Sequence, residues 1–159
     1  MKLLECHVDN FGKLSNYEYR FSESLTVIQE PNGFGKSTLA AFIKAMLYGL
    51  PRTAGRSVAG NERKKYLPWQ GGTYGGSLDF EFDGTAYRVW RTFGKTAAKD
   101  TFKLWDLTNR RESKQFSEKL GEELFQLDAE SFMRSVYMSQ SQNTDTTATT
   151  SIQAKLSNL

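Results

Sequence analysis

The sequence has almost none of the side chains on which disulfide frameworks and thiolate or imidazole metal sites depend. Its 159 residues include one cysteine and one histidine, Cys6 and His7, which are neighbours in the first apolar segment. A CxxC pair, an HxxxH spacing and a disulfide framework are therefore excluded. A chain of this length buries about two thirds of its unfolded surface without such supports, so we expect one domain. The lone cysteine fits a reducing cytoplasm, where we expect the protein.

Long hydrophobic runs are missing as well. The longest apolar stretch, residues 38–50, is interrupted by Lys44 and is too short to cross a bilayer. We expect neither a signal peptide nor a membrane partner.

Charge is nearly balanced, with 21 basic and 18 acidic side chains and a net charge of +3, but one segment is unusual. Residues 51–65 hold five basic side chains and one acidic side chain, which gives this segment a charge of +4. The rest of the chain has a net charge of −1. The basic residues are Arg52, Arg56, Arg63, Lys64 and Lys65. Two interpretations stay open: a phosphate-rich partner near this segment, or a solvated surface loop.

Alternating hydrophobicity predicts strands over residues 1–8 and 17–21, joined by a turn at 10–13. The short β-branched run at 25–28 is typical of a buried central strand. On the first strand we expect one face to hold Leu4, Cys6 and Val8.

From Ser37 the apolar residues follow the period of a helix that ends near Gly49. Residues 52–72 have no period and are predicted to be a mobile loop. An antiparallel β-meander is expected over 74–106, with a hairpin turn at Asp83–Gly84.

The C-terminal third has weaker patterns. We expect a helical period over 116–127, a short helix over 129–134 and a strand over 136–138. The last apolar positions, Ile152, Leu156 and Leu159, form the stripe of a helix at which the sequence stops. Two interpretations stay open: a chain cut within a longer helix, or a short terminal helix packed on its own domain.

The string EPNGFGKST, Glu30 to Thr38, lies between the predicted strand and helix and is one residue away from the P-loop pattern GxxxxGK[ST]. Gly33 and Gly35 let the backbone curl around phosphates, Lys36 supplies a positive charge, and Ser37 offers a hydroxyl to Mg²⁺. A glycine-rich structural turn is the alternative. Glu30 replaces the first glycine of the pattern, and its carboxylate is compatible with phosphate only if it points away.

The residues around this motif resemble the start of the SMC-like ABC ATPases, a group that includes SbcC-type repair ATPases, RecF and YhaN-like proteins. The resemblance is carried by the turn Asn10–Lys13, the run 25–28, the P-loop and the helix 39–49. It implies an α/β P-loop NTPase, the N-terminal lobe of an ABC-type head, with a mixed sheet and the antiparallel meander. It also implies ATP and Mg²⁺ as cofactors. The nucleotide-binding residues implied are Lys13, Asn32, Gly33, Phe34, Gly35, Lys36, Ser37 and Thr38.

A second match is the segment 135–142, SVYMSQSQ, which is similar to the family's Q-loop. The resemblance assigns Gln140 to Mg²⁺ and the attacking water, with Gln142 as the second choice. A glutamine amide suits this role because it ligates a hard cation without adding charge. Without the family, a surface glutamine in a polar loop is the alternative.

The domain expected over 1–159 is thus a single N-terminal lobe. Its parts are strands, P-loop and first helix (1–50), the basic loop (51–73), the meander (74–106), a helical segment with the Q-loop (112–142) and the start of a helix that resembles a coiled-coil root (147–159).

Two motifs of the complete ATPase are missing from the sequence, a Walker B strand and an LSGG signature. The family implies that a C-terminal lobe and a second head supply them, in a homodimer, so hydrolysis by this chain alone is not expected. It also suggests DNA and a nuclease subunit as partners. The only residue-level support for DNA is the basic loop together with Arg88, Arg91, Arg110 and Arg111, which suit a solvated face equally well.

Other functions fit less well. A GTPase needs an NKxD motif, which the sequence lacks. A small-molecule kinase also uses a P-loop and a basic lid, but the meander differs from the parallel sheet that such enzymes have. A nucleotide-gated clamp with little turnover is the remaining alternative, and Glu30 makes it plausible.

Overall fold

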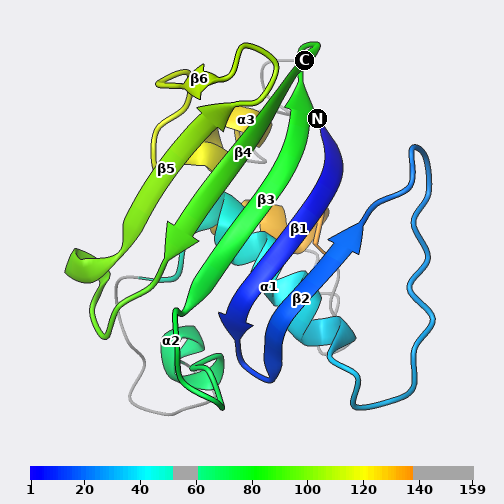
Figure 1. Cartoon of the computed structure of the whole chain (residues 1–159), viewed down its shortest axis with the longest axis vertical. Coiled ribbons are helices and arrows are strands. Elements are labelled where there is room, and N and C mark those ends of the chain that lie inside the picture. The colour runs from blue at the N-terminus through cyan, green and yellow to red at the C-terminus, as the bar shows by residue number, and fades with distance from the viewer. Residues whose placement is uncertain (52–60, 138–159) are drawn as a thin grey trace.

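The computed structural model describes residues 1–51 and 61–137. Its centre is a six-stranded sheet in which every neighbouring pair of strands is antiparallel, in the order β2-β1-β3-β4-β5-β6 (Figure 1). The strands are β1 (Lys2–Phe11), β2 (Leu14–Arg20), β3 (Gly75–Phe82), β4 (Thr85–Thr92), β5 (Thr101–Asp106) and β6 (Arg111–Glu112).

Helices form a second layer behind the sheet in Figure 1. The longest, α1 (Lys36–Tyr48), packs against β1, β3 and β4, and α3 (Leu120–Phe125) packs against α1. Next along the chain, α4 (Ala129–Ser135) packs against α3. A fourth helix, α2 (Glu62–Lys65), lies at the end of the sheet near the β1–β2 turn, and a 3-10 turn spans Ala97–Lys99.

The hydrophobic core lies between the sheet and α1. The apolar stripe of α1 is buried at Leu39, Phe42 and Met46, which confirms the helix predicted from Ser37 to Gly49. The sheet contributes alternate residues such as Leu78 and Phe80 of β3, both fully buried. Burial of this stripe positions the N-terminus of α1, where the glycine-rich motif lies.

Strand β1 differs from the predicted simple alternation. Its register with β3 shifts between Leu3 and Glu5, so Leu4 is an extra residue on that strand, and a second shift follows Val8. A bulge of this kind reverses the face of the residues beyond it. Leu3 therefore packs on the same core as Cys6 and Val8, and the expectation that Leu4 shares their face is wrong.

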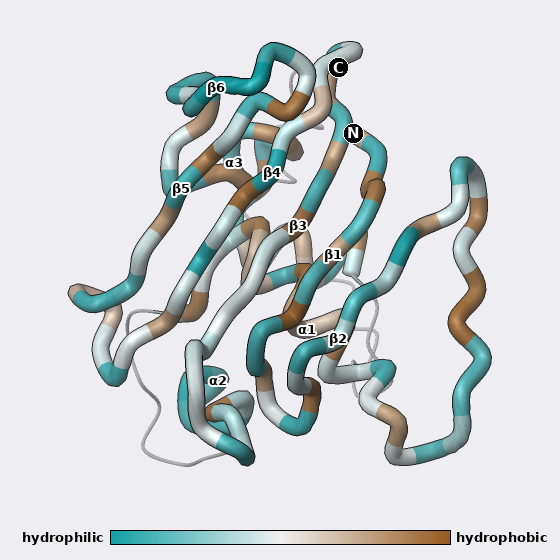
Figure 2. The backbone as a smooth tube through the Cα atoms, viewed as in Figure 1, coloured by the Kyte–Doolittle hydropathy of each residue, from teal (hydrophilic) through white to brown (hydrophobic). Residues whose placement is uncertain are grey.

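The predicted mixed sheet is also wrong for the described residues. Leu25 and Val27, in the segment expected to form a buried central strand, are 78% and 70% exposed, and the structure assigns no strand there. Figure 1 shows the chain between β2 and α1 as a long excursion beyond the β2 edge, and Figure 2 shows apolar positions along it. A buried strand needs neighbours on both sides, and residues 25–28 pair with none of the six strands.

Two smaller predictions also need correction. The loop expected over 52–72 contains α2, whose first turn is capped by the Asn61 side chain accepting from the Lys64 amide. Val136 and Tyr137, predicted to begin a strand, follow α4 as turn and irregular chain. The strands of the meander and the turn at Asp83–Gly84 are confirmed. Predictions for 52–60 and for 138–159, including the terminal helix, lie outside the described residues.

In the part of the chain that the structure describes, the helices leave the second face of the sheet open (Figure 1). Alternate residues of β4 and β5 on this face bring cations next to indole rings: Arg88 with Trp90, and Lys103 with Trp105. Within residues 1–51 and 61–137, no helix is long and apolar enough to span a membrane.

Candidate functional site

The glycine-rich motif forms a tight loop that leads directly into α1. Gly33 and Gly35 have φ values of +89° and +117°, a region that side chains rarely adopt, and Gly35 is the residue at which α1 begins. The Phe34 amide donates to the Pro31 carbonyl at 3.1 Å, and the Leu39 amide donates to the Gly35 carbonyl at 2.8 Å. The two glycines thus let the chain turn sharply, in the left-handed conformation, immediately before α1.

The N-terminus of α1 is suited to an anion. Among the described residues, no side chain caps this helix end, and its first turn holds no acidic residue. The first amides of an α-helix have no partner within the helix and carry partial positive charge. A phosphate placed against them would accept several N–H groups at once.

Lys36, the lysine of the motif, folds back onto its own loop. Its ammonium donates to the Glu30 carbonyl and, at 3.3 Å, to the Pro31 carbonyl. Both acceptors are neutral backbone groups on a surface segment. An anionic ligand would compete with them well, because hydrogen bonds between charged partners are about twice as strong as neutral ones.

A second lysine reaches the loop from another element. Lys13 belongs to the turn between β1 and β2, and its side chain lies over both glycines of the loop. A Cβ added to Gly33 would lie 4.0 Å from Lys13 Nζ, and one added to Gly35 would lie 3.2 Å from Lys13 Cε. Two cations, Lys13 and Lys36, therefore flank the first amides of α1.

The β1–β2 turn is itself held by the chain that follows α2. The Gly12 amide donates to the Tyr66 carbonyl at 2.7 Å, and the Trp69 amide donates to the Gly12 carbonyl at 3.0 Å. The Tyr66 ring stacks on Phe11, with centroids 5.0 Å apart. Gly12 also fits closely against α1, since a Cβ there would lie 3.1 Å from Thr38 Cγ2. Sequence reasoning missed this clamp, because hydrogen bonds between backbone groups leave no signal in the residue types.

Glu30, the departure from the P-loop pattern, is accommodated without backbone strain. Positive φ values among the described non-glycine residues occur only at four other positions, so Glu30 has an ordinary conformation. Its side chain is exposed, and it is the Glu30 carbonyl, not the carboxylate, that meets Lys36. The replacement thus leaves the loop glycines at 33 and 35 in the required geometry.

The remaining residues expected at the site are only partly assessable. Asn32 and Ser37 are exposed beside the loop, and Phe34 packs edge-on against Tyr17 with centroids 5.7 Å apart. Gln140 and Gln142 lie outside the described residues. The described residues contain no group of three or more His, Cys, Asp and Glu side chains that would hold a metal ion.

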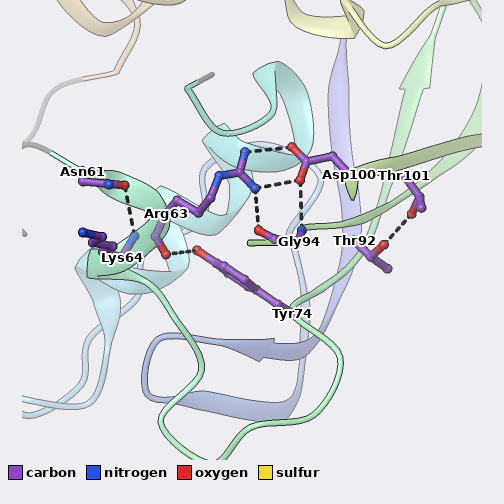
Figure 3. Close-up of polar contacts among 8 residues, drawn as sticks. All are labelled: Asn61, Arg63, Lys64, Tyr74, Thr92, Gly94, Asp100 and Thr101. Atoms are coloured by element: carbon purple, nitrogen blue, oxygen red, sulfur yellow. Dashed lines mark hydrogen bonds and ion pairs between the residues drawn. The ribbon is translucent and has the colours of Figure 1, made fainter. Parts of the chain in front are cut away.

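One residue of the basic segment has a structural role. Arg63 of α2 forms a two-pronged ion pair with Asp100, at 2.7 and 2.9 Å, and donates to the Gly94 carbonyl at 2.9 Å (Figure 3). Asp100 also accepts from the Gly94 amide at 3.0 Å. The hydrogen bond from Arg63 to the Asp100 carboxylate is the main cause that raises the pKa of Arg63. The Arg63 side chain thus joins α2 to the loop that follows β4. Lys64 and Lys65 stay exposed.

Arg91 and Arg88, two of the arginines that suggested DNA binding, also bind groups within the protein. Arg91 is 6% exposed and donates to the Met46 carbonyl at 2.8 Å and to the Leu47 and Glu118 carbonyls, so it caps the end of α1. Burial lowers its pKa to about 10. Arg88 pairs with Asp79 directly across the strands at 2.6 Å. Arg110 and Arg111 remain exposed at the β5–β6 turn.

Cys6 and His7 do not form a site together, because they lie on opposite faces of β1. Cys6 is 1% exposed in the core, and burial raises the pKa of its thiol to about 12, so it remains protonated and unreactive. His7 lies on the open face between Asp9 and Glu18, with both ring nitrogens 3.1 Å from a carboxylate oxygen.

A family model described as an AAA domain matches residues 5–158. The chain is also similar to the uncharacterized protein YhaN of Bacillus subtilis (strain 168), with 39% identity over 82 residues. This match covers 51% of the chain and 8% of YhaN, so the chain spans a small part of that relative's length.

Proposed function

Since the chain belongs to the family of AAA domains and has the P-loop NTPase α/β fold that this membership implies, we propose that it is the ATP-binding part of an SMC-like ATPase head. The observation that carries the proposal is the uncapped N-terminus of α1, preceded by two left-handed glycines and flanked by Lys13 and Lys36. That arrangement binds a chain of phosphates by backbone amides and two positive charges.

In this proposal, residues 32–38 and Lys13 hold the triphosphate. Lys36 exchanges its two carbonyl acceptors for phosphate oxygens, and Ser37, with Gln140, ligates Mg²⁺. Bound Mg²⁺ would neutralise phosphate charge. Lys36 and Gln140 are the catalytic residues of the complete protein. Gln140→Ala is expected to spare ATP binding and to weaken only the steps that depend on Mg²⁺.

The complete ATPase is proposed to need more than this chain. A C-terminal lobe and a second head would supply the Walker B acid and the signature motif, and ATP-driven dimerisation would couple hydrolysis to DNA binding or repair. The resemblance to SMC-like proteins supports these partners, as it does a nuclease subunit. Of the basic residues considered for DNA binding, Lys64, Lys65, Arg110 and Arg111 are exposed, whereas Arg52 and Arg56 lie outside the described residues.

Calorimetric titration with ATP and Mg²⁺ tests the proposal, with GTP as the comparison ligand. Lys36→Ala should reduce ATP affinity by roughly 10- to 100-fold, as expected for loss of a charged hydrogen-bond donor. Lys114→Ala, which removes an exposed lysine from the β6 end of the sheet, is the matched control and should bind as the wild type does. Equal ATP affinity in the wild type and Lys36→Ala would refute the proposal.

A further inference from the structure

Trp69 is a large aromatic side chain that the fold leaves in water. It is 76% exposed, whereas Tyr66, three residues earlier, is partly buried against Phe11. Burial of an indole is among the largest hydrophobic contributions that a side chain can make to stability, and Trp69 does not make it. An exposed indole on a fixed backbone offers a ligand a flat aromatic face with little rotational freedom to lose.

The backbone at Trp69 is fixed with respect to the P-loop by a short series of contacts. Its amide donates to the Gly12 carbonyl at 3.0 Å, and the Gly12 amide donates to the Tyr66 carbonyl. Gly12 in turn lies against Thr38 in the first turn of α1. The next residue, Lys13, covers the loop glycines. Trp69 is thus adjacent, through one turn, to the cations that would neutralise phosphates.

We propose that the indole of Trp69 is the surface on which the base of the bound nucleotide stacks. The inference rests on the proposed function, because it assumes that the phosphates lie at the N-terminus of α1. A nucleotide with its phosphates beneath Lys13 would reach Trp69 if its sugar and base followed the β1–β2 turn, to which the Trp69 amide is hydrogen-bonded. Stacking on an aromatic ring accepts any base because every base has a π face.

A second aromatic pair lies near the loop but is less suited to this role. Phe34 and Tyr17 contact each other edge to face, and both are partly buried. Both rings therefore already contact other side chains, and the Tyr17 ring also stacks on Tyr19. The indole of Trp69 is exposed, so a base could stack on it without displacing a packing contact.

Titration with two ligands separates the base from the phosphates. Inorganic tripolyphosphate has the anionic part of ATP and no base. Trp69→Ala should weaken ATP binding about 10-fold, the effect typical of one lost stacking contact, and leave tripolyphosphate binding unchanged. Trp69→Phe should keep most of the ATP affinity. Trp90→Ala, which removes the indole on the open face of the sheet, is the matched control and should match the wild type.

The outcomes distinguish this inference from the proposed function. If Trp69→Ala and the wild type bind ATP equally, the stacking role is wrong while phosphate binding stands. If Trp69→Ala weakens tripolyphosphate as much as ATP, Trp69 acts on the loop and not on the base, which also overturns the inference. If the wild type binds neither ligand, the proposed function fails and the inference fails with it. Thermal unfolding of each variant confirms that it is folded.

Discussion

At the scale of single residues, hydrogen bonds to the Asp106 carboxylate, at the end of β5, make the stability of the protein depend on pH. Asp106 is buried and accepts from the Asn109 side-chain amide at 2.7 Å and from the Asn109 backbone amide at 2.8 Å. The side-chain bond is the main cause that lowers the pKa of Asp106, and the backbone bond adds to it. These contacts favour the ionised carboxylate in the folded state.

Because its folded pKa is depressed, Asp106 contributes stability above the unfolded value of about 3.9, and that contribution is lost as pH falls through the folded pKa. Asp106→Asn should therefore reduce the loss of stability between pH 5 and strongly acidic pH, measured by urea unfolding at each pH. Asp83→Asn, at an exposed turn, is the control. Identical pH profiles for Asp106→Asn and the wild type would contradict this account.

Residue roles were the least predictable from the sequence. Arg91 shares a face of β4 with the buried Tyr87 and Val89, and its guanidinium is buried against three carbonyls at the helix layer. Periodicity assigns a side chain to a face but does not reveal that a helix end with free carbonyls lies opposite. Lys36, by contrast, was identified because the P-loop spacing itself fixes its position.

At the scale of elements, the Arg63–Asp100 pair joins α2 to the loop that follows β4 (Figure 3). The same helix is also held by the ion pair between Glu62 and Lys44 of α1, and by the Tyr74 hydroxyl, which donates to the Arg63 carbonyl at 3.2 Å. Arg63→Ala should lower the free energy of unfolding by about 1.5–3 kcal/mol, because it leaves a partly buried carboxylate without its charged donor. Arg63→Lys should recover only part of this loss, since an ammonium does not reproduce the two-pronged contact.

Urea denaturation measures these changes, with Lys64→Ala as the control for removing a basic residue from the same helix. Lys64 is exposed, and its substitution should change stability by less than about 0.5 kcal/mol. If Arg63→Ala and Lys64→Ala have the same denaturation midpoint, the ion pair contributes nothing and the assignment is wrong.

Elements with a strong internal period were predictable, and those stabilised by contacts were not. α1 was predicted to within one residue at each end because its apolar stripe and the glycines around it agree. The short helix α2 was missed, since four residues show no period and depend on the Asn61 cap. No strand forms at 25–28, although the composition of this segment suits a buried strand. The described residues supply no strands to enclose it.

At the scale of the whole molecule, the exposed excursion between β2 and α1 bears on how the chain assembles. Leu25 and Val27 are largely exposed on it, although their β-branched surroundings suit a sheet interior. In the proposed complete head, strands of the C-terminal lobe would enclose this segment. Amide hydrogen exchange over residues 22–30 should therefore be fast in this chain alone.

The same amides should exchange much more slowly when the C-terminal lobe is supplied, while protection of β3 and β4 changes little. The amides of β3 serve as the internal control because both neighbours of that strand are already present. Unchanged exchange over 22–30 in the assembled protein would contradict a completed sheet at this position.

The central claim is that phosphates bind at the N-terminus of α1, and amide chemical shifts of the ¹⁵N-labelled chain test it most directly. On addition of ATP with Mg²⁺, the largest shifts should occur at Gly33, Gly35 and Ser37, whose amides would contact the phosphates. The open face of the sheet around Arg88 should stay unchanged. Shifts confined to that open face, with the loop amides unmoved, would show that the nucleotide binds elsewhere and that the account is wrong.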